Sequence, residues 1–342
     1  MVTTKDLAER LQLSVSTVGR ALADDRRISE QTKVRVREAA AEMGYVGNLA
    51  ARMMRGASSN VVGLVIPDIR NSFFVTIAHE LSSVMVAQGY QLMLAETNDD
   101  RTTELRQLRE LAASRVAGIV IVPTSRPHGD SVKLLQGIPH VQLLRKHPSL
   151  GTQWFGLDDR QALREATGHL VERGHTRIAY VGGPAERSTG AQRLEGYHQS
   201  LRDAGLPQRA DWVELGPPSS VEHGRDALRR LLELPQAPTA VVLGAVQHTV
   251  GAVDELFRGG VKVPQELSVV GFGDETGFSW WGPGLTTIHL PIREIAASCG
   301  LWFVRRLSSR PGDDDGAFAS VSPGSVVFRG STAPPGRSRP AR

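Results

Sequence analysis

The chain has 342 residues, of which 40% are apolar and 22% are charged. This length suits one small domain followed by a larger α/β body, and the composition is that of a globular protein. No run approaches the roughly 18 uninterrupted apolar residues that a membrane span needs, so no membrane partner is expected. The first residues carry no apolar signal core, and we therefore expect a cytoplasmic protein.

The cysteine content and the distribution of charge narrow the class of protein further. Cys299 is the only cysteine, which excludes an intrachain disulfide and a cysteine-based metal site, and we expect neither a metal nor a cofactor. The net charge is +4, and ten lysine or arginine residues stand against seven acidic residues before Gly56. This excess suits a surface that binds DNA phosphates, although a solvated helix surface would carry the same charges.

Three short helices are predicted in the first 46 residues. Each follows a residue that can cap it, namely Thr4, Ser14 and Ser29. The first helix reaches residue 11, the second reaches residue 22, and the third runs from residue 30 to about residue 43 and ends at Gly44. Their buried faces are expected to hold Leu7, Ala8, Leu11, Val18, Ala21, Leu22, Val34, Val36, Ala39, Ala40 and Met43.

A tight turn at residues 12–13 separates the first two helices, which is the arrangement of a helix-turn-helix. The second helix of such a unit enters the major groove, and its outward residues here are Val15, Ser16, Thr17 and Arg20. An arginine can form a bidentate contact with guanine, and a valine can touch the methyl group of thymine. A three-helix bundle without a DNA role is the alternative.

The string VTTKDLAERLQLSVSTVGRALADDRRISEQTKVRVREAAAEMGYVGN resembles the DNA-binding domain of the lactose-repressor family over its whole length. Two positions depart from the family pattern: Gly19 replaces a serine and Gly47 replaces a proline. Gly19 costs roughly 0.5–1 kcal/mol of helix propensity relative to alanine. The resemblance implies that this domain contacts operator DNA through Thr4, Ser14, Val15, Ser16, Thr17 and Arg20.

Residues 47–59 are expected to form a hinge. In the resembled family a short helix here forms only on operator DNA and wedges an apolar side chain into the minor groove. By resemblance the wedge is Met54, the small Ala51 approaches the groove, and Asn48 and Arg52 contact DNA. An ordinary linker helix would show the same basic and apolar residues, and this alternative stays open.

Strand and helix patterns alternate through the rest of the chain. Strands are predicted over residues 61–66, 90–95, 118–122, 140–144, 178–181, 240–243 and 267–272. Helices are predicted over residues 73–88, 101–113, 160–173, 193–204, 223–232, 250–258 and 292–306. Such alternation is typical of parallel sheets covered by helices, in which ligands bind beyond the carboxyl ends of the strands.

This body resembles the periplasmic sugar-binding fold that the lactose-repressor family carries, in the strings VVGLVIPDIRNSFF, VAGIVIVPT, ERGHTRIAYVGGP, QRLEGYHQSLRDAG, VPQELSVVGFGD, GLTTIHLP and VVFRGST. The fold class implied is α+α/β, with a helix-turn-helix domain (1–46) and a two-lobed body (60–331). One lobe would comprise residues 60–159 and 291–319, and the other residues 160–289 and 320–331. The crossovers would lie near Asp159, His289 and Ser320. Residues 332–342 are rich in proline and arginine and are predicted to form a disordered tail.

The resemblance also implies a small-molecule effector in the cleft between the lobes. Carried over by position, its contacts are Asn71, Phe73, Phe74, Thr124, Asp158, Arg187, Thr189, Arg193, Asp274 and Trp281. The family's usual acid and amide are replaced, by Gly273 and by Ala245-Val246, and no aromatic residue stands near Ser219. Sugar hydroxyls would therefore lack partners, and we expect a less hydroxylated effector, an aromatic compound or a short carboxylic acid held by Arg193 and Arg187.

These observations predict a DNA-binding repressor that is not an enzyme. It would bind a pseudo-palindromic operator as a homodimer, and the effector would change the angle between the lobes and so the hinge. Whether the effector releases or promotes DNA binding stays open. A transport protein would carry an export signal and would lack a DNA-binding domain, which is the reverse of what this sequence shows. The histidines are too scattered along the sequence for a metal site. A DNA-binding regulator whose body only dimerises is the remaining alternative.

Overall fold

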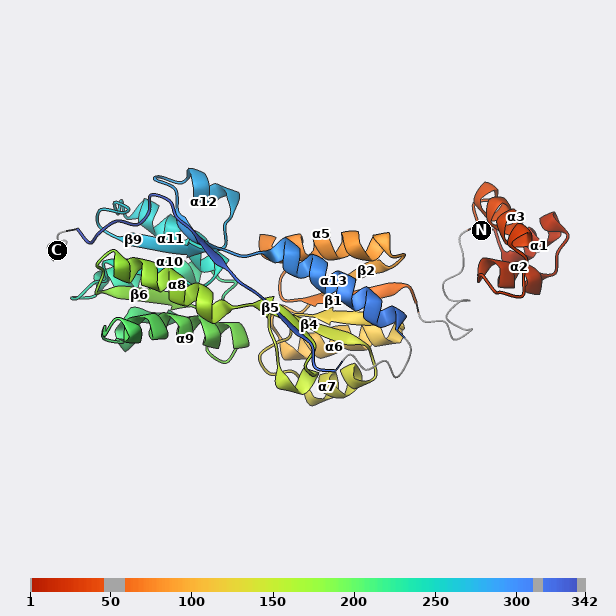
Figure 1. Cartoon of the computed structure of the whole chain (residues 1–342), viewed down its shortest axis with the longest axis horizontal. Coiled ribbons are helices and arrows are strands. Elements are labelled where there is room, and N and C mark those ends of the chain that lie inside the picture. Colours follow the sequence, from red (N-terminus) through yellow and green to blue (C-terminus); the bar gives the residue numbers. More distant parts are fainter. Residues whose placement is uncertain (1, 46–58, 310–315, 337–342) are drawn as a thin grey trace. The chain divides into compact units, whose positions relative to one another are not determined.

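A computed structural model shows the fold and describes residues 2–45, 59–309 and 316–336. The chain divides into two compact units, Met1–Ser59 and Asn60–Arg342 (Figure 1). Each unit is described by itself below. Within the described ranges, no helix is both long enough and apolar enough to cross a membrane.

The first unit contains the three predicted helices. They are α1 (Thr4–Leu11), α2 (Val15–Leu22) and α3 (Glu30–Glu42). Leu7, Val18, Ala21 and Val36 are fully buried where the three helices meet. The apolar spacing of the sequence predicted this core, and burying these side chains is the main stabilising contribution of so small a unit.

Two of the three predicted helix caps are confirmed. The hydroxyls of Ser14 and Ser29 accept hydrogen bonds from the third residue beyond each of them, at the start of α2 and α3. The cap of α1 was predicted one residue too late, because Thr3 and not Thr4 caps it. Thr3 and Asp6 form a reciprocal capping box, in which the Asp6 carboxylate accepts from the Thr3 amide at 2.7 Å.

The buried face of α3 differs from the prediction at one position. Val34 is 46% exposed, whereas the neighbouring Lys33 is buried. At 100° per residue, Val34 lies on the side of the helix opposite to Val36 and cannot share its face. Lys33 is tolerated there because its ammonium group pairs with Asp24 and Glu30.

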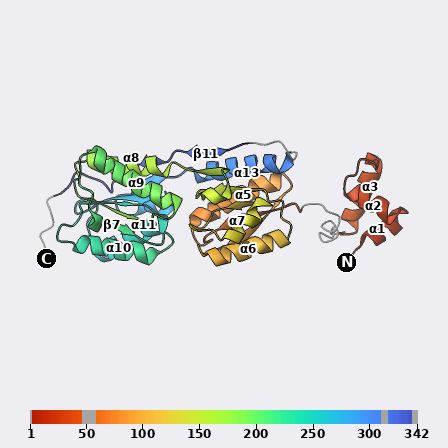
Figure 2. The ribbon, with the colours of Figure 1, turned by 90° about the horizontal axis from the view of Figure 1, so that it is seen from below.

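The body begins at Asn60 and has two lobes, each built on one six-stranded sheet. The first sheet has the order β11-β5-β4-β3-β1-β2, and all its neighbouring strands are parallel. Helices α5 and α13 cover one face and α6 and α7 cover the other (Figure 2). The elements are β1 (Val61–Ile66), α5 (Ser72–Ala87), β2 (Gln91–Glu96), α6 (Arg101–Ala113), β3 (Gly118–Ile121), α7 (Gly129–Gln136), β4 (His140–Leu143), η1 (Pro148–Leu150), β5 (Trp154–Leu157), α13 (Ile292–Ser308) and β11 (Ala319–Ser322).

The second sheet has the order β12-β10-β9-β8-β6-β7 and is parallel except for the pair β10–β12. Helices α8 and α9 pack on one face, and α10 and α11 pack on the other (Figure 2). The elements are α8 (Asp159–Glu172), β6 (Ile178–Gly182), α9 (Ser188–Asp203), η2 (Ala210–Trp212), β7 (Val213–Leu215), α10 (Val221–Glu233), β8 (Ala240–Leu243), α11 (Val246–Arg258), β9 (Ser268–Phe272), α12 (Thr276–Trp280), β10 (Thr286–His289) and β12 (Ser325–Val327).

Glycine brings α10 and α11 unusually close together. A Cβ atom at Gly251 would lie 1.9 Å from the carbonyl oxygen of Val221, and one at Gly224 would lie 2.4 Å from that of His248. Real Cβ atoms never approach backbone this closely, so only glycine fits at these two contacts. The backbones of the two helices can therefore contact each other directly.

The chain passes between the lobes three times, after β5, after β10 and between β11 and β12. The third crossing was predicted near Ser320, but β11 pairs with β5 through Ser322, so the crossing comes after that residue. The start of the predicted tail also differs. The Thr332 hydroxyl bonds the His169 ring and Ala333 bonds Ser268, so residues 332–336 pack on the second lobe. Residues 337–342 lie outside the described ranges.

Candidate functional site

The N-terminal end of α2 presents a row of small polar groups. The Ser14 hydroxyl accepts from the amide of Thr17 at 3.0 Å and lies 2.8 Å from the hydroxyls of both Ser16 and Thr17. Val15 is 50% exposed, so a methyl-bearing surface stands beside these hydroxyls. Thr4 begins α1 and is half-buried. These side chains supply both the hydrogen-bonding and the apolar contacts that reading of a major groove requires.

The cations of this unit fall into two groups. Arg10, Arg27, Lys33 and Arg37 form ion pairs with acidic residues of the same unit. Arg20 is exposed at the end of α2, and no ion pair to it exists within residues 2–45. The predicted contacts Asn48, Ala51, Arg52 and Met54 lie outside the described residues. Arg20 is therefore the cation of α2 that is available to a partner.

A cavity lies in the body where the two lobes meet. It encloses about 790 Å³ of space, a figure that includes space open to solvent. Its walls come from the loops at the carboxyl ends of strands in both sheets. The lining residues are Pro67, Asp68, Asn71, Phe73, Phe74, Asp99, Val122, Leu144, Arg145, Leu157, Asp159, Thr189, Arg193, Pro218, Ser219, Ala245, Val246, Phe272, Leu290 and Ile292.

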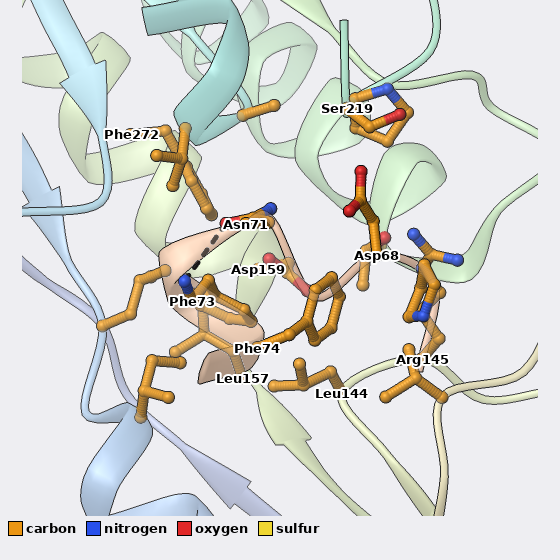
Figure 3. Close-up of a pocket in the computed structure, with 18 of the residues that line it drawn as sticks. Asp68, Asn71, Phe73, Phe74, Leu144, Arg145, Leu157, Asp159, Ser219 and Phe272 are labelled. Carbon is orange, nitrogen blue, oxygen red and sulfur yellow. Dashed lines mark hydrogen bonds between the residues drawn. The ribbon is translucent and has the colours of Figure 1, made fainter. Parts of the chain in front are cut away.

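One side of the cavity is aromatic and aliphatic. Phe73 and Phe74 contact each other edge to face, with ring centroids 5.5 Å apart, at the start of α5. The Asn71 side chain caps this helix by accepting from the Phe73 amide at 3.1 Å, which holds both rings in the cavity. Phe272 lies on the same side as Phe73, whereas Asp68 and Arg145 lie on the other (Figure 3). A flat apolar ring would fit the first side.

A buried ion pair forms the floor of the cavity. The Arg193 Nε donates to the Asp159 carboxylate at 2.6 Å, and its Nη1 donates to the carbonyl oxygen of Gly244 at 2.9 Å. The guanidinium also lies 4.0 Å from the centre of the Phe272 ring. Burial raises the pKa of Asp159, and the charge of Arg193 opposes this shift. Arg193 therefore reaches the cavity with two of its five N–H donors already used, one of them on a carboxylate.

The opposite side of the cavity is charged. Arg145 donates to both carboxylate oxygens of Asp99, and Arg187 approaches the same carboxylate from α9 at 3.1 Å. Asp68 pairs with the exposed Arg70 at 2.9 Å. Behind them Glu104 is fully buried and accepts from the Thr124 amide at 2.8 Å, and burial raises the pKa of Glu104. This side thus offers carboxylates and guanidiniums that are already paired.

The structure brings five of the ten predicted effector residues to the cavity wall. These are Asn71, Phe73, Phe74, Thr189 and Arg193. The other five do not line it: Thr124 lies behind Glu104, Asp158 caps α8, Arg187 reaches only Asp99, Asp274 pairs with Arg329, and Trp281 packs on the core of the second lobe. Asp274 is held away because Arg329 and the Thr287 hydroxyl both bind its carboxylate.

Four charged lining residues were not predicted: Asp68, Asp99, Arg145 and Asp159. Each lies two or three residues beyond the end of a parallel strand, which is the signal that could have found them. They also correct the premise that this cavity lacks acids. The acid missing at Gly273 is replaced by carboxylates from other loops, so hydrogen-bond acceptors are present.

Two family models match most of the chain. Residues 59–301 match the family described as periplasmic binding proteins and sugar binding domain of the LacI family. Residues 3–48 match the bacterial regulatory proteins of the lacI family. The chain belongs to the LacI family of bacterial regulators. It is therefore a DNA-binding transcriptional regulator with an effector-binding body, and the predicted fold class and function are confirmed.

Several proteins are similar to this LacI-family chain over nearly its full length. The HTH-type transcriptional repressor CytR of Escherichia coli K12 is 29% identical over 331 residues, which cover 96% of both chains. The ribose operon repressor of the same strain is 31% identical over 304 residues, covering 86% of this chain and 90% of the relative. A complex of the regulator CelR with cellobiose has a TM-score of 0.72 and 25% identity, and covers 97% of this chain and all of its own.

The loop that carries Pro218 and Ser219 into the cavity of this LacI-family protein rests on a buried histidine. His248, on α11, is fully buried, and its Nε2 donates to the carbonyl oxygen of Pro217 at 2.9 Å. The ring of His223 lies beside it, tilted by 52° and with 4.9 Å between the ring centroids. Burial lowers the pKa of His248 from 6.5 to about 4, because the charged ring would lose its hydration.

This pKa predicts acid sensitivity of the fold. As the pH falls from 7 to 5, the unfolded chain takes up a proton at His248 and the folded protein does not, so the free energy of unfolding decreases. The contribution of this residue to that decrease should be about 2 kcal/mol. Urea unfolding at both pH values would measure it, with His248→Gln keeping the bond to Pro217. A variant that loses as much stability as the parent between these pH values would contradict the prediction.

Proposed function

We propose that this LacI-family protein represses transcription as a homodimer and that a small molecule bound between its lobes controls its affinity for operator DNA. The cavity at the junction of the two sheets carries this proposal, because both lobes line it with apolar rings and a few polar groups, as is usual in small-molecule sites. A ligand there would have different affinities for different lobe arrangements, which is the requirement for allosteric control.

The DNA-reading part of the proposal rests on α2. Val15, Ser16 and Arg20 are exposed along the helix, and the cap at Ser14 fixes where the helix begins. Arg20 would bind guanine or a phosphate, and the hydroxyls of Ser16 and Thr17 would contact base edges or phosphates. Ser14, at the start of α2, and Thr4, at the start of α1, would contact the sugar-phosphate backbone of the DNA. The hinge contacts proposed at Asn48, Ala51, Arg52 and Met54 would complete the interface in the minor groove.

For the effector we propose an uncharged compound with a flat ring. The side of the cavity formed by Phe73, Phe74 and Phe272 favours such a ring. A carboxylic acid is disfavoured, because the guanidiniums of Arg193 and Arg187 each already face a carboxylate. A second carboxylate would bring like charges together in a site of low dielectric constant. Polar atoms on the ring would instead meet Asp68, Thr189 and Ser219.

A thermal-shift series would test the effector class on the full chain. Nicotinamide and nicotinate share one ring and differ in charge, while ribose and cellobiose test the sugars named for similar proteins. At about ten times its Kd, nicotinamide should raise the Tm by about 3–6 °C and nicotinate by less. Phe73→Ala should abolish the shift, and Phe257→Ala, which alters an exposed ring of α11 outside the cavity, should keep it.

Each other outcome of this series has a definite meaning. A larger shift with nicotinate than with nicotinamide would contradict the proposal that the effector is uncharged. A shift with the sugars alone would contradict the proposal that it contains a flat ring. No shift with any small molecule, in a protein that still binds mapped operators, would favour a body that only dimerises. A binder of either class should also change the Kd for operator DNA, which mobility-shift titration would measure.

A further inference from the structure

A second depression lies on the surface of the second lobe and shares no lining residue with the cavity between the lobes. It crosses α8, with the end of α9 on one side and β12 on the other. On the first side the Arg164 guanidinium binds Asp203 of α9, and on the second the His169 ring contacts the ring of Phe328, which follows β12. We call this surface the α8 depression.

A glycine opens the floor of the α8 depression. Gly168 comes three residues after Glu165 and four before Glu172, so all three lie on one side of the helix. A Cβ atom at Gly168 would lie 3.6 Å from the hydroxyl oxygen of Ser200 on α9, so the missing side chain leaves this hydroxyl uncovered. Ser200 is 6% exposed, and its hydroxyl has no hydrogen-bond partner within residues 2–45, 59–309 and 316–336. A buried hydroxyl without a partner is unfavourable, so it would accept or donate a bond to a bound molecule.

The α8 depression carries negative charge. Glu165 and Glu172 are exposed, stand two helical turns or about 10 Å apart, and form no ion pair within the described ranges. The lining contains one arginine, Arg164, and its guanidinium is already bound to Asp203 at 2.8 Å. Burial lowers the pKa of His169, so its ring adds no positive charge at pH 7. Two carboxylates are thus available to a cationic partner.

An apolar patch lies beside these carboxylates. Phe328 is 61% exposed, although its ring contacts that of His169 with 4.6 Å between centroids. Val171 and Val326 are half-buried and also line the depression. An exposed aromatic ring next to unpaired charges and a buried hydroxyl is the composition of a protein-binding surface. Nucleic acids and anionic lipids fit poorly, because the carboxylates would repel their phosphates.

We propose that the α8 depression binds an extended basic segment of another protein, with two arginine or lysine residues three positions apart and an apolar residue between them. An extended chain advances about 3.3 Å per residue, so three positions span the separation of Glu165 and Glu172. The two cations bind these carboxylates, and the apolar residue covers Gly168 and contacts Phe328. A backbone group of the segment bonds the Ser200 hydroxyl. This surface is separate from the DNA-reading helix and from the effector cavity.

A labelled peptide tests the proposal on the full chain. The peptide GRPLRG has the proposed spacing and an apolar residue, and fluorescence anisotropy at low ionic strength gives its Kd. The acidic peptide GEPLEG should bind at least tenfold more weakly, and GRPSRG, which lacks the apolar residue, at least threefold more weakly. Raising the salt concentration should weaken the binding of GRPLRG, because the ion pairs are exposed to solvent.

Three variants of the chain locate the site. Glu165→Gln combined with Glu172→Gln should weaken the Kd for GRPLRG at least fivefold. Gly168→Leu should weaken it at least tenfold by filling the depression, and the helix should tolerate it because a Cβ atom there makes only an ordinary contact with Ser200. Glu233→Gln, which alters an exposed carboxylate of α10 outside the depression, is the matched control and should leave the Kd unchanged. All three should bind operator DNA as the parent does.

Several results would overturn the proposal. They are no binding of GRPLRG, equal binding of the acidic peptide, and an unchanged Kd in the Gly168→Leu variant. A chain ending at Gly336 separates one further occupant, because residues 337–342 contain three arginines. Equal binding of GRPLRG to the full and the shortened chain supports a partner protein. Binding to the shortened chain alone would show that the chain's own residues take the site, and would also overturn the proposal.

Discussion

Arg20→Ala should weaken binding to the preferred operator by about five- to 150-fold, which corresponds to 1–3 kcal/mol for a lost bidentate contact to guanine. The effect should be confined to sequence preference. Arg20 is exposed on α2 and forms no ion pair within residues 2–45, so its removal leaves the three-helix core unchanged. Binding to unrelated duplex DNA, which depends on the sum of phosphate contacts, should weaken much less.

The operator for this measurement would come from selection of random duplexes by the full chain. Fluorescence anisotropy at fixed salt would then give the Kd of parent and variant for the selected site and for a scrambled duplex. Arg10→Ala is the matched control, because Arg10 is bound to Glu42 between α1 and α3. Equal losses on both duplexes would show that Arg20 contacts only phosphate, and an unchanged preference would contradict the role proposed for α2.

Arg193→Met should be among the most destabilising single substitutions in the body. It leaves the carboxylate of Asp159 buried in the cavity floor without its ion-pair partner. Removing one member of a buried pair typically costs about 3–5 kcal/mol, because the remaining charge is neither hydrated nor neutralised. The bond to Gly244 and the contact with Phe272 are lost as well. The affinity of the cavity for its ligand should decrease when these contacts are lost.

A double variant separates the charge effect from loss of packing. Asp159→Leu combined with Arg193→Met replaces both charges by apolar groups of similar size, and it should recover most of the stability that Arg193→Met loses. Denaturant unfolding of the four proteins in the cycle gives the coupling energy between the two residues. A double variant that is less stable than Arg193→Met would contradict the buried-charge explanation.

The contacts around the cavity are of two kinds, those within one lobe and those between the lobes. The contact between Phe73 and Phe74 lies within the first lobe, and the Arg193–Asp159 pair lies within the second, so neither depends on the lobes meeting. The contact between Arg187 and Asp99 exists only when the lobes meet. A ligand that contacts both lobes would favour the arrangement in which they meet, by the difference in its affinity for the two arrangements.

Local signals in the sequence sufficed to predict the helices of the helix-turn-helix domain and many elements of the body. The caps at Ser14 and Ser29 were predictable because a serine hydroxyl satisfies amides within three residues of itself. Two long helices began earlier than predicted, α9 at Ser188 and α11 at Val246, because neither has a side chain that bonds at its cap. Without such a bond, the sequence holds no marker of where the helix begins.

The sequence by itself determined the helix-turn-helix, the alternation of strands and helices and the family, since these depend on patterns within short stretches of chain. Only the tertiary structure decided the cavity. Asp68, Asp99, Arg145 and Asp159 come from four separate loops, and the order β5-β4-β3-β1-β2 brings the ends of their strands to one edge of the sheet. The short strands β11 and β12 and the packing of Thr332 likewise depend on partners far away in the chain, because a three- or four-residue strand is stable only when a neighbour completes its hydrogen bonds.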